Sequence, residues 1–151
     1  MSKILLTGST GFIGSNLLKE LSKTNKIYIT LRYPYKKLSL NTKNIYKIKY
    51  KNYNNLNNKL KHLRVDTAIH CATHYVKDHN SKDINKFTDS NILFGNIILE
   101  NLEKMKVKKF INFSTVWEDN YRMNGFVNLY SFYKKSFSLI IKYYSKKFTK
   151  I

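Results

Sequence analysis

The chain has 151 residues with a formal net charge of +19, and 42% of its residues are hydrophobic. This length suits one domain with its own core, and the apolar content, with 12 tyrosines and 9 phenylalanines, excludes a disordered chain. The sequence has no apolar run of about 18 residues that would cross a membrane, and its single cysteine, Cys71, can form no internal disulfide. The lone cysteine makes a reducing, cytoplasmic setting the expectation. We expect no signal peptide, because the first predicted strand begins almost at the N-terminus.

The positive charge raises the question of nucleic-acid binding. All but three of the 28 basic residues are lysine, and the lysines are scattered along the sequence. Surfaces that recognise nucleic acids tend to use arginine, whose planar fork binds phosphate with two hydrogen bonds. We therefore expect no specific nucleic-acid partner, only weak binding to polyanions at low salt. A basic nucleic-acid-associated protein is the most remote hypothesis of function.

Predicted strands and helices alternate along the chain. The strands are expected at Lys3–Thr7, Ile27–Leu31, Ile45–Tyr50, Thr67–Cys71 and Lys109–Phe113. The helices are expected at Gly11–Ser22, Leu56–Leu63, Asn91–Lys104 and Leu129–Lys147, with a loop or a short helix at Arg32–Asn44. This alternation predicts an α/β fold, a doubly wound parallel sheet with helices on both faces. Five strands in the order 3-2-1-4-5 are expected, which is the usual order of a Rossmann-like fold.

A glycine-rich turn joins the first predicted strand to the first predicted helix. Its sequence is Thr7-Gly8-Ser9-Thr10-Gly11-Phe12-Ile13-Gly14. Gly8 would permit the tight turn, Gly11 would let a pyrophosphate approach the backbone, and Gly14 would let the helix pack near the strand. The phosphates would then bind the free N–H groups at the start of the helix. Such turns also close hairpins and cap helices, but the strand before it and the helix after it favour a dinucleotide site.

Tyr130 and Lys134 begin the last predicted helix, and their spacing places them on one face of it. A nearby ammonium and an oxidised nicotinamide would stabilise the phenolate and lower the tyrosine pKa from about 10. Tyr130 would then exchange a proton with a substrate hydroxyl, and Lys134 would also hold the nicotinamide ribose. The same spacing is typical of an ordinary amphipathic helix in a chain rich in tyrosine and lysine. The glycine-rich turn earlier in the chain favours the catalytic interpretation.

Four segments together resemble the extended short-chain dehydrogenase/reductase family of sugar-nucleotide epimerases, dehydratases and reductases. These segments are Thr7–Gly14, Asp66–Thr73, Asn91–Glu100, and Ile111–Trp117 followed by Leu129–Lys134. The last is most similar to the CDP-sugar reductases, such as the CDP-abequose and CDP-paratose synthases. The resemblance implies that residues 1–151 form one NAD(P)-binding Rossmann-like domain, the N-terminal half of such an enzyme.

The resemblance also implies which residues would bind the cofactor and the substrate. The cofactor would contact Thr7, Gly8, Thr10, Gly11, Phe12, Ile13 and Gly14 in the turn, and Cys71, Ala72, Thr73, Asn91 and Lys134 farther along the chain. Tyr130 would be the acid/base for a nucleotide-sugar substrate, with Lys134 beside it. Thr115 or Ser114 would supply the hydroxyl that orients the substrate, because the register of this segment leaves both open.

Arg32 and Asn52 depart from the family pattern. Many members carry an acidic residue at the end of the second strand, where it binds the ribose 2′-OH and selects NAD. Arg32 stands there instead and can pair with a 2′-phosphate, so NADP is the expected cofactor and NAD the alternative. Asn52 stands where the family has an adenine-binding aspartate, and its amide can still hydrogen-bond an adenine edge.

Length is the largest departure, because family members are longer and their C-terminal half supplies the last strands and the sugar-nucleotide pocket. We therefore expect the chain to lack the substrate region. An uncovered sheet edge and apolar helix faces would favour a homo-oligomer or a complementary chain. The first hypothesis is an NAD(P)-dependent nucleotide-sugar enzyme that needs its substrate region supplied, and the second is a truncated, non-catalytic dinucleotide-binding protein.

A histidine and cysteine group lies close together in the sequence. Its members are His70, Cys71, His74 and His79. Their spacing matches no closed zinc set, and His70 falls in a predicted buried strand. We expect no metal site.

Overall fold

The structure of the chain is a computed structural model that describes residues 1–36, 38, 40, 42–119 and 125–147. The chain divides into two compact units. The sheet unit comprises Met1–Ala72 and Glu100–Asn112, and the helical unit comprises Thr73–Leu99 and Phe113–Ile151. The assignment of residues 1–151 to one domain stays a prediction.

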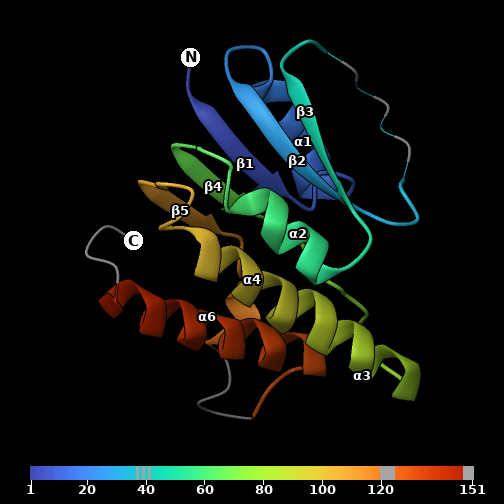
Figure 1. Cartoon of the computed structure of the whole chain (residues 1–151). Helices are drawn as coiled ribbons and strands as arrows, with labels where there is room; N and C mark the ends of the chain where they lie inside the picture. Colours follow the sequence, from blue (N-terminus) through green and yellow to red (C-terminus); the bar gives the residue numbers. More distant parts are fainter. Residues whose placement is uncertain (37, 39, 41, 120–124, 148–151) are drawn as a thin grey trace. The chain divides into compact units, whose positions relative to one another are not determined.

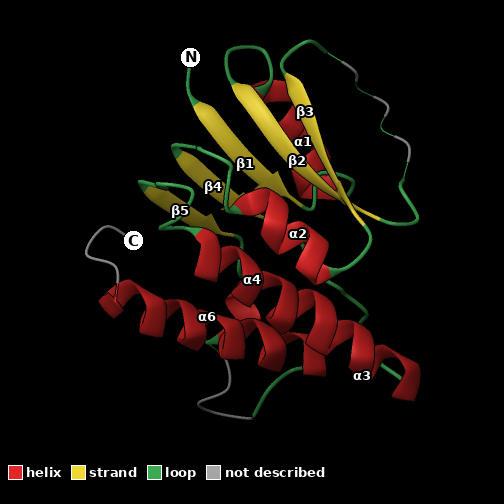
Figure 2. Cartoon of the chain, viewed as in Figure 1, coloured by secondary structure: helices red, strands yellow, loops and turns green. Residues whose placement is uncertain are grey.

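Five parallel strands form the sheet unit (Figure 1, Figure 2). They are β1 (Lys3–Thr7), β2 (Lys26–Arg32), β3 (Ile45–Tyr50), β4 (Thr67–His70) and β5 (Lys109–Asn112). Their order in the sheet is β3-β2-β1-β4-β5, which confirms the predicted topology. Successive residues of a strand point to opposite faces, yet Leu5 and Leu6 of β1 and Thr30 and Leu31 of β2 are all buried, as expected for central strands of a parallel sheet.

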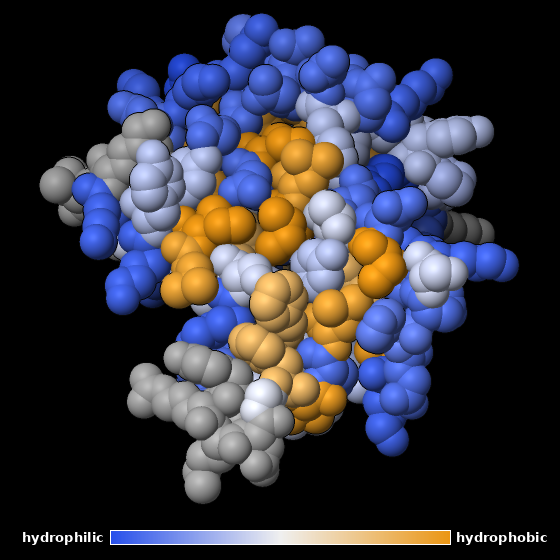
Figure 3. Space-filling model, turned by 90° about the horizontal axis from the view of Figure 1, so that it is seen from below, coloured by the Kyte–Doolittle hydropathy of each residue, from blue (hydrophilic) through white to orange (hydrophobic). Residues whose placement is uncertain are grey.

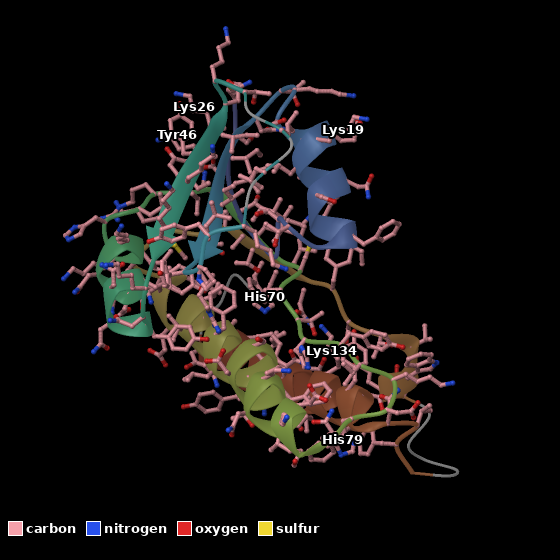
Figure 4. All side chains as sticks on the ribbon, turned by 90° about the vertical axis from the view of Figure 1, so that its right-hand side faces the viewer. Lys19, Lys26, Tyr46, His70, His79 and Lys134 are labelled. Atoms are coloured by element: carbon pink, nitrogen blue, oxygen red, sulfur yellow. The ribbon has the colours of Figure 1, made fainter. Side chains whose placement is uncertain are left out.

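Two helices lie on opposite faces of this sheet. They are α1 (Phe12–Leu21) and α2 (Tyr53–Leu60), and both Figure 1 and Figure 4 show the sheet between them. The chain steps from β1 to β2 in one direction across the sheet and from β3 to β4 in the other. Because parallel connections are right-handed, these opposite steps place the helices on opposite faces. The doubly wound arrangement is therefore present within the sheet unit.

The segment between β2 and β3 shows no helix in its described residues, which are 33–36, 38, 40 and 42–44. Of the two predicted alternatives, the loop therefore holds for this part. The next helix, α2, starts earlier than predicted because Asn52 caps it. The Asn52 Oδ1 accepts a hydrogen bond from the backbone N–H of Asn55 at 2.9 Å, and this satisfies one free donor of the first turn.

Helices and connecting loops make up the helical unit. The helices in its described residues are α3 (Ser81–Phe87), the π-helix η1 (Thr88–Leu93), α4 (Phe94–Asn101), the 3₁₀ helix η2 (Val116–Glu118) and α6 (Leu129–Lys147). The end of α4 belongs to the sheet unit, and α6 has its predicted bounds. The predicted start of the middle helix at Asn91 was wrong, because helical structure already begins at Ser81. Asn80 and Asp83 form a capping box there, in which each side chain binds the backbone of the other residue.

Apolar residues occupy two sides of α6. Phe137 and Tyr144 are buried, whereas Phe132, Leu139 and Tyr143 are exposed at a spacing that places them on one side of the helix. Figure 3 shows apolar side chains gathered on the face that is seen from below. Among the described residues, no helix combines the length and the apolar character that crossing a membrane requires.

Candidate cofactor and catalytic site

The glycine-rich turn of the sheet unit runs from the end of β1 into α1. Gly8 has a φ of +71°, in the left-handed region that favours glycine, and a Cβ there would lie 2.5 Å from the backbone nitrogen of Ala72. A Cβ on Gly14 would overlap the carbonyl oxygen of Gly8, whereas a Cβ on Gly11 would lie 3.4 Å from that oxygen. Gly8 and Gly14 therefore permit tight packing of the turn. A Cβ on Gly11 would make only an ordinary contact, so the packing of the turn does not require glycine there, whereas the approach of a pyrophosphate would.

The N-terminus of α1 is arranged as an anion site. Gly11 is its N-cap residue, and within the described residues no side chain caps this end. The side chains of Asn52 and Asn80, by contrast, cap α2 and α3. The first N–H groups of α1 therefore remain for an anion at the positive end of the helix dipole. The exposed residues around this end are Thr10, Gly11, Phe12 and Ile13.

Thr7 connects the ends of β1 and β4. Its hydroxyl lies 2.9 Å from Nδ1 of His70 and accepts a hydrogen bond from the backbone N–H of Ala72 at 3.4 Å. The backbone N–H of Cys71 donates to the Thr7 carbonyl oxygen at 3.3 Å. Both Thr7 and His70 are buried. The Thr7 side chain thus supports the turn from within the unit, and its direct contact with a cofactor stays a prediction.

Arg32 and Asn52 lie at the carboxyl ends of β2 and β3. Arg32 is exposed, and its guanidinium donates hydrogen bonds to the hydroxyls of Tyr50 and Tyr53. The side-chain oxygen of Asn52 caps α2, and a contact of its amide with adenine stays a prediction. Sequence reasoning missed both tyrosines. The available signal was their position around Asn52, because Tyr50 ends a predicted strand and Tyr53 directly follows Asn52.

Tyr130 and Lys134 lie in the first turns of α6, within the helical unit, where Figure 4 labels Lys134. Lys134 is 4% exposed, and its ammonium donates to the carbonyl oxygen of Phe113. Tyr130 is half-buried, and its ring meets that of Tyr75 edge to face with the centroids 4.9 Å apart. A backbone carbonyl distant in sequence therefore orients Lys134. The spacing of the two residues did not predict that contact.

The surroundings of Tyr130 raise its pKa above the ordinary tyrosine value. Burial is the largest cause, because it disfavours the charged phenolate. A hydrogen bond with the Thr73 side chain acts in the opposite direction, and the charges of Tyr75 and Glu118 add to the rise. The hydroxyl therefore keeps its proton at neutral pH. The lowering expected from Lys134 together with an oxidised nicotinamide stays a prediction.

Ser114 and Thr115, the two candidate substrate-orienting residues, are engaged near η2. The Ser114 hydroxyl donates to Oε2 of Glu118 at 2.5 Å, and that oxygen also accepts from the Ser138 hydroxyl at 3.0 Å. The Thr115 hydroxyl accepts from the backbone N–H of Trp117 at 3.4 Å, which caps η2. The choice between Ser114 and Thr115 stays open. Sequence reasoning missed Glu118, which both binds Ser114 and influences Tyr130.

Asn91 lies in η1 and is 3% exposed. Its Oδ1 accepts from the backbone N–H of His74 at 2.6 Å, and its Nδ2 donates to the His74 carbonyl oxygen at 3.0 Å. Both ends of the amide thus hold the segment that carries Thr73 and Tyr75, the residues in contact with Tyr130. This arrangement fits a positioning role, and a direct cofactor contact of Asn91 stays a prediction.

The histidines of the predicted group have protein partners. The His74 Nε2 lies 3.2 Å from Oδ1 of Asp83, and the His70 ring binds Thr7. His79 packs edge to face against Phe87 with the ring centroids 6.5 Å apart. Within the described part of the chain, no three His, Cys, Asp or Glu side chains form a group able to hold a metal ion.

The glycine-rich turn and the strand order agree with a comparison of the whole sequence. Residues 4–148 match the NAD dependent epimerase/dehydratase family. The chain belongs to this family. The match confirms the resemblance drawn from four short segments. The part of the family fold present here is the cofactor-binding half.

Two relatives in the family show how much of a whole enzyme the chain covers. It is 32% identical over 147 residues to the CDP-abequose synthase of Yersinia pseudotuberculosis, covering 95% of this chain and 51% of that protein. It is 33% identical over 146 residues to the dTDP-D-glucose 4,6-dehydratase of Dictyostelium discoideum, covering 85% of this chain and 34% of that protein. The chain therefore spans about half the length, or less, of these relatives.

Two solved structures share the fold. The UDP-glucose 4-epimerase of Thermotoga maritima, solved with UDP-glucose, has a TM-score of 0.81 and 19% identity, covering 97% of this chain and 52% of that one. The enzyme WbmH of Bordetella bronchiseptica, solved with NAD+, has a TM-score of 0.77 and 19% identity, covering 95% of this chain and 53% of that one. These similarities establish a Rossmann-like fold.

Proposed function

We propose that the chain is the cofactor-binding half of an NAD(P)-dependent nucleotide-sugar epimerase, dehydratase or reductase, with a preference for NADP. The observation that carries the proposal is the uncapped start of α1, reached through a turn in which Gly8 and Gly14 have no room for a side chain. Such a helix end binds pyrophosphate through its backbone N–H groups. The two relatives, a CDP-abequose synthase and a dTDP-D-glucose 4,6-dehydratase, support a nucleotide-sugar substrate.

The sheet unit would bind the adenosine diphosphate part of the cofactor. The turn would hold the pyrophosphate, with its closest approach at Gly11. Arg32 would bind a 2′-phosphate, because a charged hydrogen bond to phosphate is stronger than one to the neutral ribose hydroxyl of NAD. Asn52 would donate from Nδ2 to a ring nitrogen of adenine, since its oxygen already caps α2.

The helical unit would supply the acid/base chemistry. A bound nicotinamide would give or accept the hydride. Tyr130 would donate a proton to the oxygen of a keto-sugar, because the raised pKa keeps its hydroxyl protonated at neutral pH. Lys134, whose ammonium donates to the carbonyl oxygen of Phe113, would place a positive charge one helical turn from Tyr130. The hydroxyl of Ser114 or Thr115 would orient the same substrate oxygen.

Cofactor binding is the first test. Addition of NADPH or NADP+ is expected to raise the melting temperature of the full chain by a few degrees, because a ligand that binds only the folded state stabilises it. NADH and NAD+ are expected to have a smaller effect at equal concentration. No shift with any of the four would overturn the cofactor assignment.

Turnover is the second test. The chain, joined to the C-terminal half of the CDP-abequose synthase of Yersinia pseudotuberculosis as a substrate region, would be mixed with NADPH and a panel of nucleotide keto-sugars, CDP-linked sugars among them. NADPH oxidation would be followed by absorbance. Tyr130→Phe is expected to lower the rate at least about a hundredfold, because general acid catalysis contributes that much. Tyr133→Phe is the matched control. Tyr133 lies on the same helix as Tyr130, and the substitution removes a hydroxyl that is hydrogen-bonded to the Thr88 hydroxyl of η1. Full activity in Tyr130→Phe would remove Tyr130 from its role.

A second candidate function is a non-catalytic dinucleotide-binding protein of the cytoplasm. The observation that favours it is the share of the relatives that the chain covers, 51% and 34%. This function predicts cofactor binding with no turnover on any sugar of the panel. The two functions therefore differ in the second test and agree in the first.

A further inference from the structure

Two tyrosines hold Arg32 at the carboxyl edge of the sheet unit. Its Nε donates to the Tyr50 hydroxyl at 3.3 Å, and its Nη2 donates to the Tyr53 hydroxyl. The guanidinium carbon lies 4.9 Å from the ring centroid of Tyr53 and 5.9 Å from that of Tyr50. At these distances the positive charge is attracted to the faces of the aromatic rings. Arg32 therefore has a defined orientation although it is exposed.

Tyr50 and Tyr53, which we call the tyrosine clamp, are themselves anchored. Tyr50 pairs with Arg32 in the register of β2 and β3, and it is 3% exposed. Tyr53 is the first residue of α2, the helix that Asn52 caps. The two rings stack, with centroids 6.2 Å apart and an interplanar angle of 28°. Two strands and a helix therefore determine where the guanidinium lies.

We propose that the tyrosine clamp positions Arg32 for the 2′-phosphate of NADP(H), which makes Tyr53 a specificity-determining residue for the cofactor. Tyrosine side chains are uncharged at neutral pH, so these two partners orient the guanidinium without neutralising its charge. A long side chain loses conformational entropy when it binds a ligand, and one that is already oriented loses less. The inference rests on the proposed NADP preference and names the residues that enforce it.

Calorimetric titration of the full chain tests the clamp, with NADPH, NADH, adenosine 2′,5′-bisphosphate and AMP as ligands. The last two differ only in the 2′-phosphate. Tyr53→Leu is expected to weaken NADPH and bisphosphate binding about tenfold and to leave NADH and AMP within about threefold. Tyr53→Phe keeps the ring and is expected to lose less. A purely structural role for Tyr53 would weaken all four ligands alike, and that result would overturn the proposal.

Two further variants complete the experiment. Tyr46→Leu is the matched control, because Tyr46 stacks on Tyr28 with the centroids 5.0 Å apart, on the same two strands, and its loss should not change the ratio of NADPH to NADH affinity. Arg32→Ala is expected to remove the preference for NADPH.

The outcomes separate this inference from the proposed function. If Arg32→Ala weakens NADPH binding and Tyr53→Leu does not, the proposed role of the tyrosine clamp is wrong and the NADP preference stands. If Arg32→Ala leaves NADPH binding unchanged, the assignment of NADP is itself wrong. Tighter NADPH binding by Tyr53→Leu would show that the tyrosines withhold Arg32 from the phosphate, and this too would overturn the proposal.

Discussion

Three glycines of one turn have three different surroundings, and substitution separates their roles. A Cβ on Gly14 would overlap the carbonyl oxygen of Gly8, whereas a Cβ on Gly11 would lie 3.4 Å from that oxygen. We expect Gly14→Ala to lower the free energy of unfolding by about 2 kcal/mol or more, because the packed backbone must move.

Gly11→Ala is the informative counterpart. The free energy of unfolding is expected to change by less than about 1 kcal/mol, since Gly11 has an extended backbone that alanine also adopts. Cofactor affinity is expected to fall at least about tenfold, because the methyl group would occupy the path of the pyrophosphate. Urea denaturation and calorimetric titration measure the two quantities. Unchanged cofactor affinity would show that the phosphates bind elsewhere.

The charge of Glu118 is expected to contribute to the pH dependence of Tyr130. A keto-sugar reduction that takes its proton from Tyr130 should be independent of pH below the tyrosine pKa and should slow as pH rises through it. Burial raises that pKa most, and the negative charge of Glu118 raises it further. Glu118→Gln removes the charge, so the decline in kcat/KM should move to lower pH.

Asp119→Asn is the control for this experiment. Asp119 is the neighbouring carboxylate, and it pairs with Lys135 at 3.1 Å. Its substitution should leave the pH profile unchanged. A decline at the same pH or a higher one in Glu118→Gln would contradict the proposed influence of Glu118.

At the scale of elements, α4 and α6 meet within the helical unit at a glycine. A Cβ on Gly95 would overlap the ring of Phe137, which is 1% exposed. We expect Gly95→Ala to cost about 1–3 kcal/mol of stability through overpacking. Phe137→Leu alone should also destabilise, because it leaves a cavity. In the double variant the smaller side chain makes room for the methyl group, so the combined cost should be less than the sum.

Urea denaturation of the four proteins forms a double-mutant cycle for this pair. A favourable coupling of about 0.5–3 kcal/mol is the expected result for residues in direct contact. Additive effects of Gly95→Ala and Phe137→Leu would show that the two helices do not meet at this point.

The helix boundaries show which elements a sequence pattern reveals. α6 was predicted correctly because its apolar residues recur over many turns. α3 was missed because its seven residues, Ser81–Phe87, include few apolar ones. The capping box of Asn80 and Asp83 was the signal for its start, and a search for capping residues before the apolar pattern would have found it.

At the scale of the whole molecule, the exposed apolar side of α6 and the net charge of +19 have opposite effects on self-association. Phe132, Leu139 and Tyr143 are 46%, 58% and 65% exposed on one side of the helix, and such apolar surface favours association. Like charge repels identical copies, and salt screens that repulsion. We expect the chain to self-associate more strongly at about 0.5 M salt than at about 0.05 M, where the Debye length is longer.

Light scattering after size-exclusion chromatography measures this association. Leu139→Lys should reduce it at both salt concentrations, whereas Tyr46→Lys, on the sheet unit, adds the same charge and should have little effect. A monomer under all conditions, or equal effects of the two variants, would exclude the α6 face as the association surface.

The sequence by itself determined where the five strands lie along the chain, the glycine-rich turn and the family. These follow from local patterns, because hydrophobic periodicity and glycine spacing act within one strand, turn or helix. The same patterns identified Arg32, Tyr130 and Lys134 as candidate site residues, since each lies at a recognisable position along a strand or helix.

Only the tertiary structure decided what these side chains contact. The tyrosines that hold Arg32 come from a neighbouring strand and the helix after it, and the carbonyl that holds Lys134 comes from Phe113, 21 residues away in sequence. The surroundings that shift the Tyr130 pKa likewise include two residues of a distant segment, Tyr75, which raises it, and Thr73, which lowers it. Contacts of this kind depend on how separate elements pack, and burial and hydrogen-bond geometry exist only once the chain has folded.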